Sequence, residues 1–393
     1  MLPYGKPTKK PTEGHMQLKM TRSLSEGCPL KNIFDIKGFE LYAQHNLPTN
    51  VSAFFSRGAG DEISLEENVS AFDRIKLLPR VLRNVEERSL SATILGERIG
   101  FPLLIAPMAF QQLAHPEGEV AVARAAYEYN VPMVVSTLST SSFEEIKKST
   151  NTLLLFQLYI YKDRKITKNL VQFAESFGYK GIVLTVDAPL YGKRTKELHD
   201  PLMLPPHLEV KNLQQAGLNL KDIPPAKLPG YLASLLDPSI TWEDIGWLRS
   251  LTSLPIILKG IMHPKDIQMA IEQNIDAIII SNHGGRQLDT ALSSIETLKH
   301  VKHSIEGKID IILDGGIRKG VDILKAIALG AKAVMVGRPI LWGLTAGGEE
   351  GVKKVLGILR AELDMAMALC GFSSITQINE EILHFQTDKQ KQI

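Results

Sequence analysis

Residues 276–285 read DAIIISNHGG, an apolar run followed at once by polar residues and two glycines. The run has the length of a strand, and its aliphatic residues do not alternate with polar ones, which is typical of a strand buried on both faces of a sheet. His283 and the residues after it therefore lie at the C-terminal end of a predicted buried strand. The number and order of similar runs decide which fold surrounds this end.

Eight such runs follow one another from about residue 102, with amphipathic stretches between them. Eight strands alternating with eight helices predict an α/β fold, the TIM (β/α)8 barrel. A doubly wound open sheet is the alternative. In chain order the predicted strands are PLLIAPMAF (102–110), VPMVVSTLS (131–139), TLLLFQLYI (152–160), GIVLTVDAP (181–189), LPIILKG (254–260), DAIIISNHGG (276–285), DIILDGG (310–316) and AVMVGRP (333–339).

The stretches between the strands have helical periodicity and carry start and stop signals. Ser141 and Ser142 stand ahead of two glutamates, and Gly330 and Gly371 follow the ends of two patterns. The predicted helices span residues 118–130, 141–149, 166–178, 241–251, 263–274, 291–305, 320–330 and 351–371.

Two regions do not follow this repeat. Residues 31–98 are predicted to form a helical N-terminal extension, in which residues 47–62 cross the barrel mouth. After the fourth strand, roughly fifty residues (188–240) precede the next helix, and a connection of that length is usually a lid or a binding loop. We therefore expect a partly ordered lid. One domain is predicted for residues 31–385, with tails at residues 1–30, which we expect to be mobile, and 386–393.

The composition excludes several classes of protein. The 393 residues include 44% hydrophobic and 22% charged residues, and the formal net charge of +2 does not favour a nucleic-acid surface. Two cysteines form neither a disulfide framework nor a zinc site. No apolar run reaches the length of a membrane span, and neither a signal-peptide core nor a terminal SKL-type address is present. We expect a cytoplasmic protein without a metal site.

Polar residues follow nearly every predicted strand. In a barrel the C-terminal strand ends form the face on which active sites are built. A core that served stability alone would not place ionisable groups there, because an uncompensated buried charge costs several kcal/mol. The residues at the successive strand ends are Met108 and Ala109, Ser136 and Thr137, Gln157 and Tyr159, Thr185 and Asp187, Lys259, His283 and Arg286, Asp314 and Arg318, and Gly337 and Arg338.

Two glycine-containing segments predict a phosphate site. DGGIRKG (314–320) follows the seventh strand and GRP (337–339) follows the eighth. Backbone amides at glycines and helix starts bind anions, and barrels usually hold phosphate at these two loops. The alternative is a pair of tight turns that need glycine.

His283 is the candidate base of the predicted site. A single histidine at a strand end is more often structural than catalytic, but Arg286 lies close behind it and has the planar fork that binds a carboxylate. Asp187, at another strand end, can stabilise the protonated imidazole. Asp289 is interpreted as structural, a loop anchor or a helix cap. Lys259 fits either a Schiff-base nucleophile or a fixed charge, and a phosphate site nearby favours the second.

The sequence resembles the FMN-dependent 2-hydroxy acid oxidase and dehydrogenase family. The resemblance rests on SNHGGRQLD (281–289) and on its order along the chain with DGGIRKG, GRP and three shorter motifs. The likeness covers roughly residues 30–385 and is greatest to oxidases of glycolate, lactate and longer-chain 2-hydroxy acids. It implies FMN as cofactor and a homotetramer. The shorter motifs are IAPMA (105–109), FQLY (156–159) and TVDAP (185–189).

The resemblance also implies a role for each matching residue. His283 is expected to be the catalytic base, supported by Asp187, while Arg194 of GKR, Arg286 and Tyr159 bind the substrate. Lys259 is expected to face the edge of the flavin ring. The other residues expected to hold FMN are Pro107, Met108, Ala109, Ser136, Gln157, Thr185, Ser281, Asp314, Gly315, Gly316, Arg318, Gly337 and Arg338.

Two substrate-site positions depart from the family pattern. Phe54 occupies the place of a tyrosine that helps to hold the carboxylate, and Leu138 that of a tryptophan in glycolate oxidase. We expect the first change to weaken or alter substrate preference and the second to admit a larger side chain, which favours lactate or a longer or aryl 2-hydroxy acid.

The resemblance implies oxidation of an L-2-hydroxy acid to the 2-oxo acid, with oxygen reduced to hydrogen peroxide. Ala109 is more similar to the oxidases than to the dehydrogenases, which carry glycine there. Three alternatives are a dehydrogenase with a quinone or carrier protein as acceptor, a non-catalytic FMN-binding protein, and an FMN barrel of non-redox chemistry.

Overall fold

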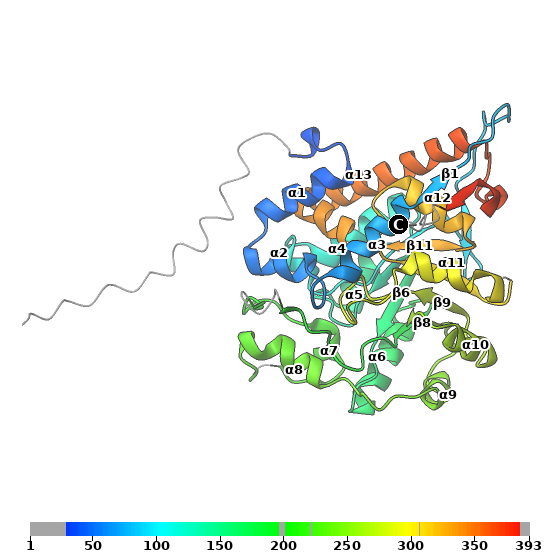
Figure 1. Ribbon diagram of the computed structural model, residues 1–393. Helices are drawn as coiled ribbons and strands as arrows, with labels where there is room; N and C mark the ends of the chain where they lie inside the picture. Colours follow the sequence, from blue (N-terminus) through cyan, green and yellow to red (C-terminus); the bar gives the residue numbers. More distant parts are fainter. Residues whose placement is uncertain (1–28, 196–200, 221, 306, 386–393) are drawn as a thin grey trace, which may run out of the picture.

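Eight parallel strands form a closed barrel in this computed structural model, which describes residues 29–195, 201–220, 222–305 and 307–385 (Figure 1). Each strand pairs with the next in chain order, and β11 pairs with β4 to close the ring. The predicted TIM barrel is confirmed, and the open sheet is wrong. The strands are β4 (Leu103–Ile105), β5 (Met133–Val135), β6 (Leu154–Leu158), β7 (Ile182–Thr185), β8 (Ile256–Ile261), β9 (Ala277–Ile280), β10 (Asp310–Asp314) and β11 (Ala333–Val336).

The strands are continuously apolar because both of their faces are buried. In β8, Ile257 belongs to the cluster inside the barrel, whereas Ile256 and Leu258 belong to the larger cluster shared with the surrounding helices. All three side chains are at most 1% exposed. Each strand thus contributes alternate residues to two separate cores.

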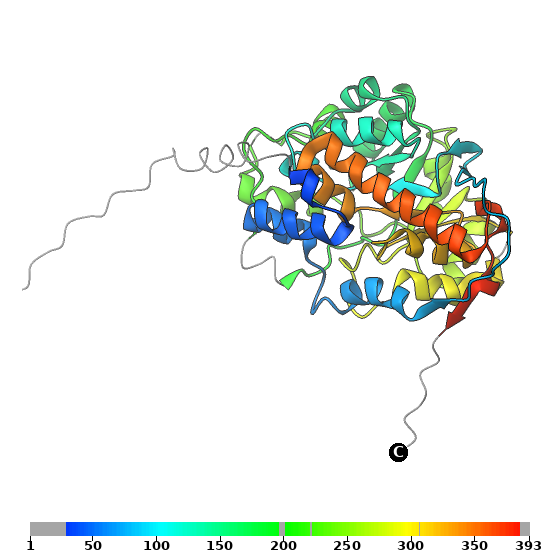
Figure 2. The same cartoon turned by 90° about the horizontal axis from the view of Figure 1, so that it is seen from above.

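Helices follow the strands as predicted. The eighth was predicted to begin at residue 351, but α13 begins at Arg338, directly after β11, and Gly347 and Gly348 interrupt its helical geometry. It packs along α1 and α4 (orange and red in Figure 2, beside α1 in blue). The helices between the strands and after them are α4 (Gly118–Glu128), α5 (Phe143–Ser149), α6 (Arg164–Ser176), α9 (Glu243–Arg249), α10 (Pro264–Glu272), α11 (Ser294–Ile305), α12 (Gly320–Ala328) and α13 (Arg338–Cys370).

The N-terminal extension is helical only in part. A 3-10 turn (Pro29–Asn32) precedes α1 (Ile36–Asn46), α2 (Thr49–Ser56) and α3 (Ile63–Asp73), and then β1 (Ile75–Leu77) pairs with β12 (Leu383–Phe385) near the C-terminus. The predicted helical extension is thus confirmed for α1 to α3, whereas the short strand after them was not predicted.

A β-hairpin ends the extension and completes the inner core. It consists of β2 (Ala92–Ile94) and β3 (Glu97–Ile99), joined by two residues of positive φ. Such a two-residue turn matches the twist of antiparallel strands. Ile94 and Ile99 join the cluster inside the barrel and are at most 1% exposed. The hairpin therefore contributes the side chains that complete the packing inside the barrel.

The long connection after β7, which is called the lid below, contains short helical segments. It contains α7 (Lys211–Gln215), a 3-10 turn (Pro225–Lys227) and α8 (Leu228–Ser234). An isolated bridge between Tyr161 and Leu236 returns the chain to the barrel. In Figure 1, α8 (green) and α2 (blue) lie on the same side of the barrel.

The predicted tails lie almost entirely outside the described residues, except that residues 29 and 30 already belong to the first 3-10 turn. Among the described residues, no helix combines the length and apolar character needed to span a membrane.

Replacing Ile94 by alanine tests the role of the hairpin. Because this side chain is fully buried, the change should leave a cavity and cost about 2–5 kcal/mol, and thus lower the thermal midpoint by several degrees. Differential scanning calorimetry measures the shift. Thr93→Ala, at an exposed position of the same strand, is the matched control and should change the midpoint little. Equal midpoints for the two variants would contradict the role of the hairpin in the core.

Candidate active site

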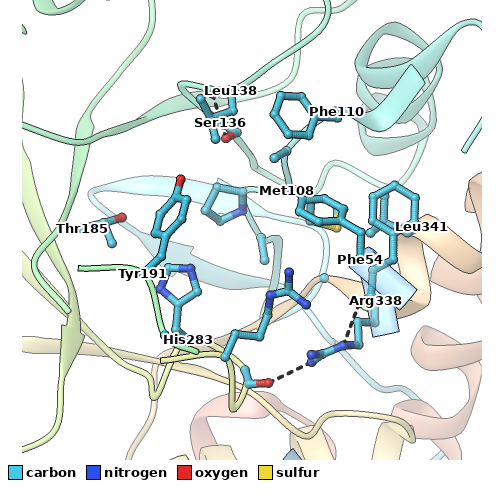
Figure 3. A pocket seen from close by; sticks show the side chains of 18 of the residues that line it. Phe54, Met108, Phe110, Ser136, Leu138, Thr185, Tyr191, His283, Arg338 and Leu341 are labelled. Carbon is cyan, nitrogen blue, oxygen red and sulfur yellow. Dashed lines mark hydrogen bonds between the residues drawn. The ribbon is translucent and has the colours of Figure 1, made fainter. Parts of the chain in front are cut away.

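A cavity of about 520 Å³ lies where the eight strands end, and α2 and the lid contribute to its wall (Figure 3). Among the predicted site residues, Asp187 and Ser281 do not line it, but each contacts a residue that does. The structure therefore brings the predicted set together. The predicted residues that line the cavity are Phe54, Pro107, Met108, Ala109, Ser136, Leu138, Gln157, Tyr159, Thr185, Arg194, Lys259, His283, Arg286, Asp314, Gly315, Gly316, Arg318, Gly337 and Arg338.

His283 is held in an unusual backbone conformation at the end of β9. Its φ of 59° lies in the left-handed region, which is uncommon for a residue with a side chain. The Ser281 hydroxyl accepts a hydrogen bond of 3.0 Å from the His283 amide. The next two residues, Gly284 and Gly285, also have positive φ, and a Cβ at Gly285 would lie 2.6 Å from the backbone of Leu65. The two glycines thus allow the turn that presents the imidazole to the cavity.

His283 and Asp187 form a hydrogen-bonded pair. The imidazole Nδ1 lies 2.9 Å from the Asp187 Oδ1, although the two residues belong to different strand ends. Burial lowers the pKa of His283 and outweighs the opposing effect of the carboxylate. Burial acts to raise the pKa of Asp187, but the attraction of His283 and Lys259 lowers it on balance. The lowered pKa of His283 favours a neutral imidazole beside the Asp187 carboxylate, which is the arrangement that a general base requires.

Lys259, at the end of β8, is a buried cation with a fixed partner. Its Nζ lies 3.0 Å from Asp314 Oδ2 and donates to the Ser281 hydroxyl at 3.1 Å. Burial acts to lower the pKa of Lys259, but Asp314 and Asp187 raise it above the ordinary value. A lysine that acts as a nucleophile needs a lowered pKa. The structure therefore favours the fixed charge over the Schiff-base nucleophile.

Two arginines and an aromatic ring form one part of the cavity wall. The guanidinium carbons of Arg286 and Arg194 lie 5.4 and 6.0 Å from the centre of the Phe54 ring. Arg286 also donates a hydrogen bond of 2.7 Å to the Arg57 carbonyl, which fixes its direction. Phe54 in turn packs against Phe110, with ring centres 5.8 Å apart. The two cations thus lie close together over an apolar floor, as a binding site for a carboxylate would require.

A second cationic region lies at the ends of β10 and β11. Arg338 donates to the carbonyls of Phe55 and Gly284, both at 3.1 Å, and Arg318 stacks over Trp342 at 5.0 Å. Among the described residues, neither guanidinium forms an ion pair with a carboxylate. Burial, together with the nearby Arg318, lowers the pKa of Arg338 to about 9. Two half-buried cations close together indicate a site for an anion.

Three polar side chains form a hydrogen-bonded row across neighbouring strands. Gln157 donates to the Thr185 hydroxyl at 3.0 Å, and its carbonyl oxygen accepts from Ser136 at 3.4 Å and from the Thr137 amide at 3.1 Å. All four residues are buried. The row therefore offers several hydrogen-bonding groups to the edge of a planar polar ring in the cavity.

Sequence reasoning missed part of the cavity wall. Tyr191, Phe110 and three apolar lid residues, Leu202, Pro229 and Leu232, also line it. Tyr191 had a signal, because it lies three residues before the predicted Arg194, whereas the lid residues belong to a segment without regular periodicity.

Comparison with known proteins decides the family. Residues 43–385 match the model of the FMN-dependent dehydrogenase family. The chain belongs to this family. It is 47% identical to an L-lactate oxidase of Nostoc sp. over 90% of this chain and 98% of that protein, and 44% identical to the human 2-hydroxyacid oxidase 1 over 90% and 97%. The crystal structure of mandelate oxidase superimposes with a TM-score of 0.83 at 38% identity, over 90% of this chain and 98% of the other.

FMN is the cofactor of the FMN-dependent dehydrogenases, and the cationic end of the cavity fits its phosphate. A dianion would compensate the charges of the two half-buried arginines, Arg318 and Arg338. Gly316 is required by the fold, since a Cβ there would lie 1.8 Å from the Asn68 carbonyl oxygen. A Cβ at Gly337 would meet the protein only at 3.6 Å, and its φ of −108° does not require glycine. A glycine at this position leaves room for a ligand to approach the backbone closely.

The remaining residues fit the flavin ring. Bound FMN would be held by Arg318, Arg338 and the glycines of both loops at the phosphate, and by Ser136, Gln157, Thr185 and Lys259 at the ring. Ser281 would act indirectly, because its hydroxyl donates to Asp314 at 2.7 Å and accepts from Lys259.

Replacing Arg338 by methionine tests the phosphate site. Loss of one charged hydrogen-bond donor, worth about 1.5–3 kcal/mol, should weaken FMN binding about ten- to a hundredfold. Quenching of flavin fluorescence by the apoprotein measures the affinity. Arg360→Met, at an exposed position of the same helix, should bind FMN like the wild type. Unchanged affinity in the Arg338 variant would show that the phosphate lies elsewhere.

Proposed function

We propose that the protein oxidises an L-2-hydroxy acid to the 2-oxo acid with FMN bound in the cavity, and that oxygen is the final electron acceptor. The substrate loses two electrons and two protons from its α-carbon and hydroxyl group, and oxygen takes up both pairs to give hydrogen peroxide. The observation that carries the proposal is the 2.9 Å contact between His283 and Asp187 in a cavity that also contains Arg194 and Arg286.

Each side chain has a distinct role in this proposal. Arg194 and Arg286 bind the substrate carboxylate, and Tyr159 donates a hydrogen bond to the substrate. His283 accepts the hydroxyl proton at Nε2, because its Nδ1 faces Asp187, and the Asp187 carboxylate stabilises the imidazolium that forms. Bound FMN would take up the two electrons that leave the α-carbon. Lys259 keeps a positive charge beside the site. This charge would favour the reduction of bound FMN, because the reduced flavin carries more negative charge.

The apolar part of the cavity wall supports a substrate side chain larger than that of glycolate. Leu138, Phe54 and Phe110 line the cavity together with the lid residues Leu202 and Leu232. These side chains offer no hydrogen-bonding group to a small polar substrate. Lactate and longer or aryl 2-hydroxy acids are therefore the proposed range, consistent with likeness to relatives named for lactate and mandelate.

Oxygen is favoured over a quinone or a carrier protein as acceptor. The relatives at 42–47% identity carry the names of oxidases, and Ala109, which lines the cavity, is the residue type expected of an oxidase. A cytoplasmic location and a homotetramer, the usual assembly of the resembled family, are also part of the proposal.

Anaerobic bleaching of the flavin tests the reaction. The holoenzyme is mixed with glycolate, lactate, 2-hydroxyoctanoate and mandelate, each as separate enantiomers. We expect L-lactate or a larger L-acid to bleach the flavin fastest, and readmitted air to restore its colour with formation of hydrogen peroxide. A flavin that none of these acids bleaches would refute the function. Reoxidation by air much slower than turnover with an artificial acceptor would instead favour the dehydrogenase.

The rate of flavin reduction should depend on the protonation of His283. The neutral imidazole is the active form, so kcat/KM should fall as the pH drops through the pKa of His283. Because burial lowers this pKa, the acid limb of the pH profile should lie below the ordinary value of 6.5. Asp187→Asn removes a charge that raises this pKa, and so should move the limb to lower pH while slowing reduction about a hundredfold. Stopped-flow rates between about pH 5 and 9 measure both effects.

The His283→Ala variant should bind FMN, but its flavin should not be reduced by the substrate. Near-normal reduction of the flavin in this variant would contradict the role of His283 as base.

A further inference from the structure

Tyr191 places a phenol hydroxyl in the cavity, and the proposed mechanism gives it no task. It lies at the start of the lid and lines the cavity with His283, Arg194 and Arg286. Figure 3 shows its ring beside His283, with Phe54 across the cavity. No residue that the structure describes forms a hydrogen bond with its hydroxyl. A polar group in this position is therefore available to a ligand in the cavity.

The loop after β9 fixes the position of Tyr191. The Gln287 amide donates to the carbonyls of Asp187 and Leu190, both at 2.9 Å, and its oxygen accepts from the Gly192 amide at 3.0 Å. The residues on either side of Tyr191 are thus held by one side chain. A Cβ at Gly192 would lie 2.3 Å from the Arg286 carbonyl oxygen, so the two segments are in close backbone contact. Tyr191 is therefore positioned before any ligand arrives.

The surroundings of the Tyr191 hydroxyl keep it protonated, so that it remains a hydrogen-bond donor. Burial raises the pKa of Tyr191 and outweighs the opposing effect of Arg194 and Arg286, so the hydroxyl stays protonated. The guanidinium carbon of Arg194 lies 5.8 Å from the Tyr191 ring and 6.0 Å from the Phe54 ring. Arg194 thus lies against both aromatic side chains. Of these two, only Tyr191 can donate a hydrogen bond to an anion that Arg194 binds.

We propose that Tyr191 donates a hydrogen bond to the substrate carboxylate that Arg194 and Arg286 bind, and thereby supplies the donor that Phe54 lacks. This inference rests on the proposed function, because it requires a 2-hydroxy acid in the cavity. It makes Tyr191 a substrate-binding residue contributed by the lid, and it predicts that the loss of a donor at Phe54 is compensated in part.

Tyr191→Phe tests the inference in the holoenzyme. We expect about ten- to a hundredfold weaker binding of oxalate, followed by the change in flavin absorbance, and a similar rise in the Kd of the fastest-reacting 2-hydroxy acid. The limiting rate of flavin reduction should change less than about threefold, because the His283 and Asp187 pair is intact. Tyr231→Phe, which removes another hydroxyl of the lid outside the cavity wall, should behave like the wild type.

Moving the hydroxyl across the cavity gives the sharper test. Phe54→Tyr in the Tyr191→Phe background should restore most of the lost affinity for oxalate, since the new hydroxyl faces the same arginines. Failure of this rescue, in a protein with a normal flavin spectrum, would overturn the claim that both positions serve one carboxylate. Unchanged oxalate affinity in Tyr191→Phe, or a fall confined to the limiting rate, would overturn the inference. Absence of bleaching by any 2-hydroxy acid in the wild type would instead refute the proposed function.

Discussion

Closure of the parallel barrel between β11 and β4 is the constraint on which the site depends. Because all eight strands run in one direction, closure collects their C-terminal ends around a single axis. His283 and Asp187 are 96 positions apart in the chain and yet meet at 2.9 Å. A shift of one residue in the register of a strand would exchange its inward and outward side chains, and so remove such contacts. The two apolar cores that fix the register therefore also fix the chemistry.

The nine residues SNHGGRQLD (281–289) organise the surroundings of the site as well as its centre. His283 faces the cavity, while Gln287 binds the first turn of the lid through backbone groups on both sides of Tyr191. The Asp289 carboxylate accepts from the amides of Asp61 and Ser64, which agrees with its interpretation as a loop anchor and joins this loop to the start of α3. One segment thus connects the barrel, the lid and the N-terminal extension.

Sequence reasoning succeeded where the physical signal is local. The barrel strands are continuous apolar runs, and the polar residues at their ends were therefore assigned to one face. The hairpin of β2 and β3 was missed because strands of three residues are too short to show a period. The early start of α13 was missed because GRP (337–339) was interpreted as a loop alone. Tyr191 was missed although it stands three residues before Arg194, because its place in the cavity wall is set by contacts between its neighbours and Gln287, about a hundred positions away.

The arrangement of charge explains why one cavity accommodates two different anions. Asp314 pairs with Lys259 near the centre, so this cation is compensated within the protein. Arg318 and Arg338 lie at one end without a carboxylate partner among the described residues, and their burial makes this charge unfavourable until an anion binds. A ligand that binds only the folded protein stabilises it, so the phosphate of FMN should contribute to stability as well as to catalysis. Arg194 and Arg286 lie instead beside the Phe54 ring, and Arg194 lies also beside Tyr191 of the lid. The two pairs of arginines therefore belong to different parts of the cavity wall.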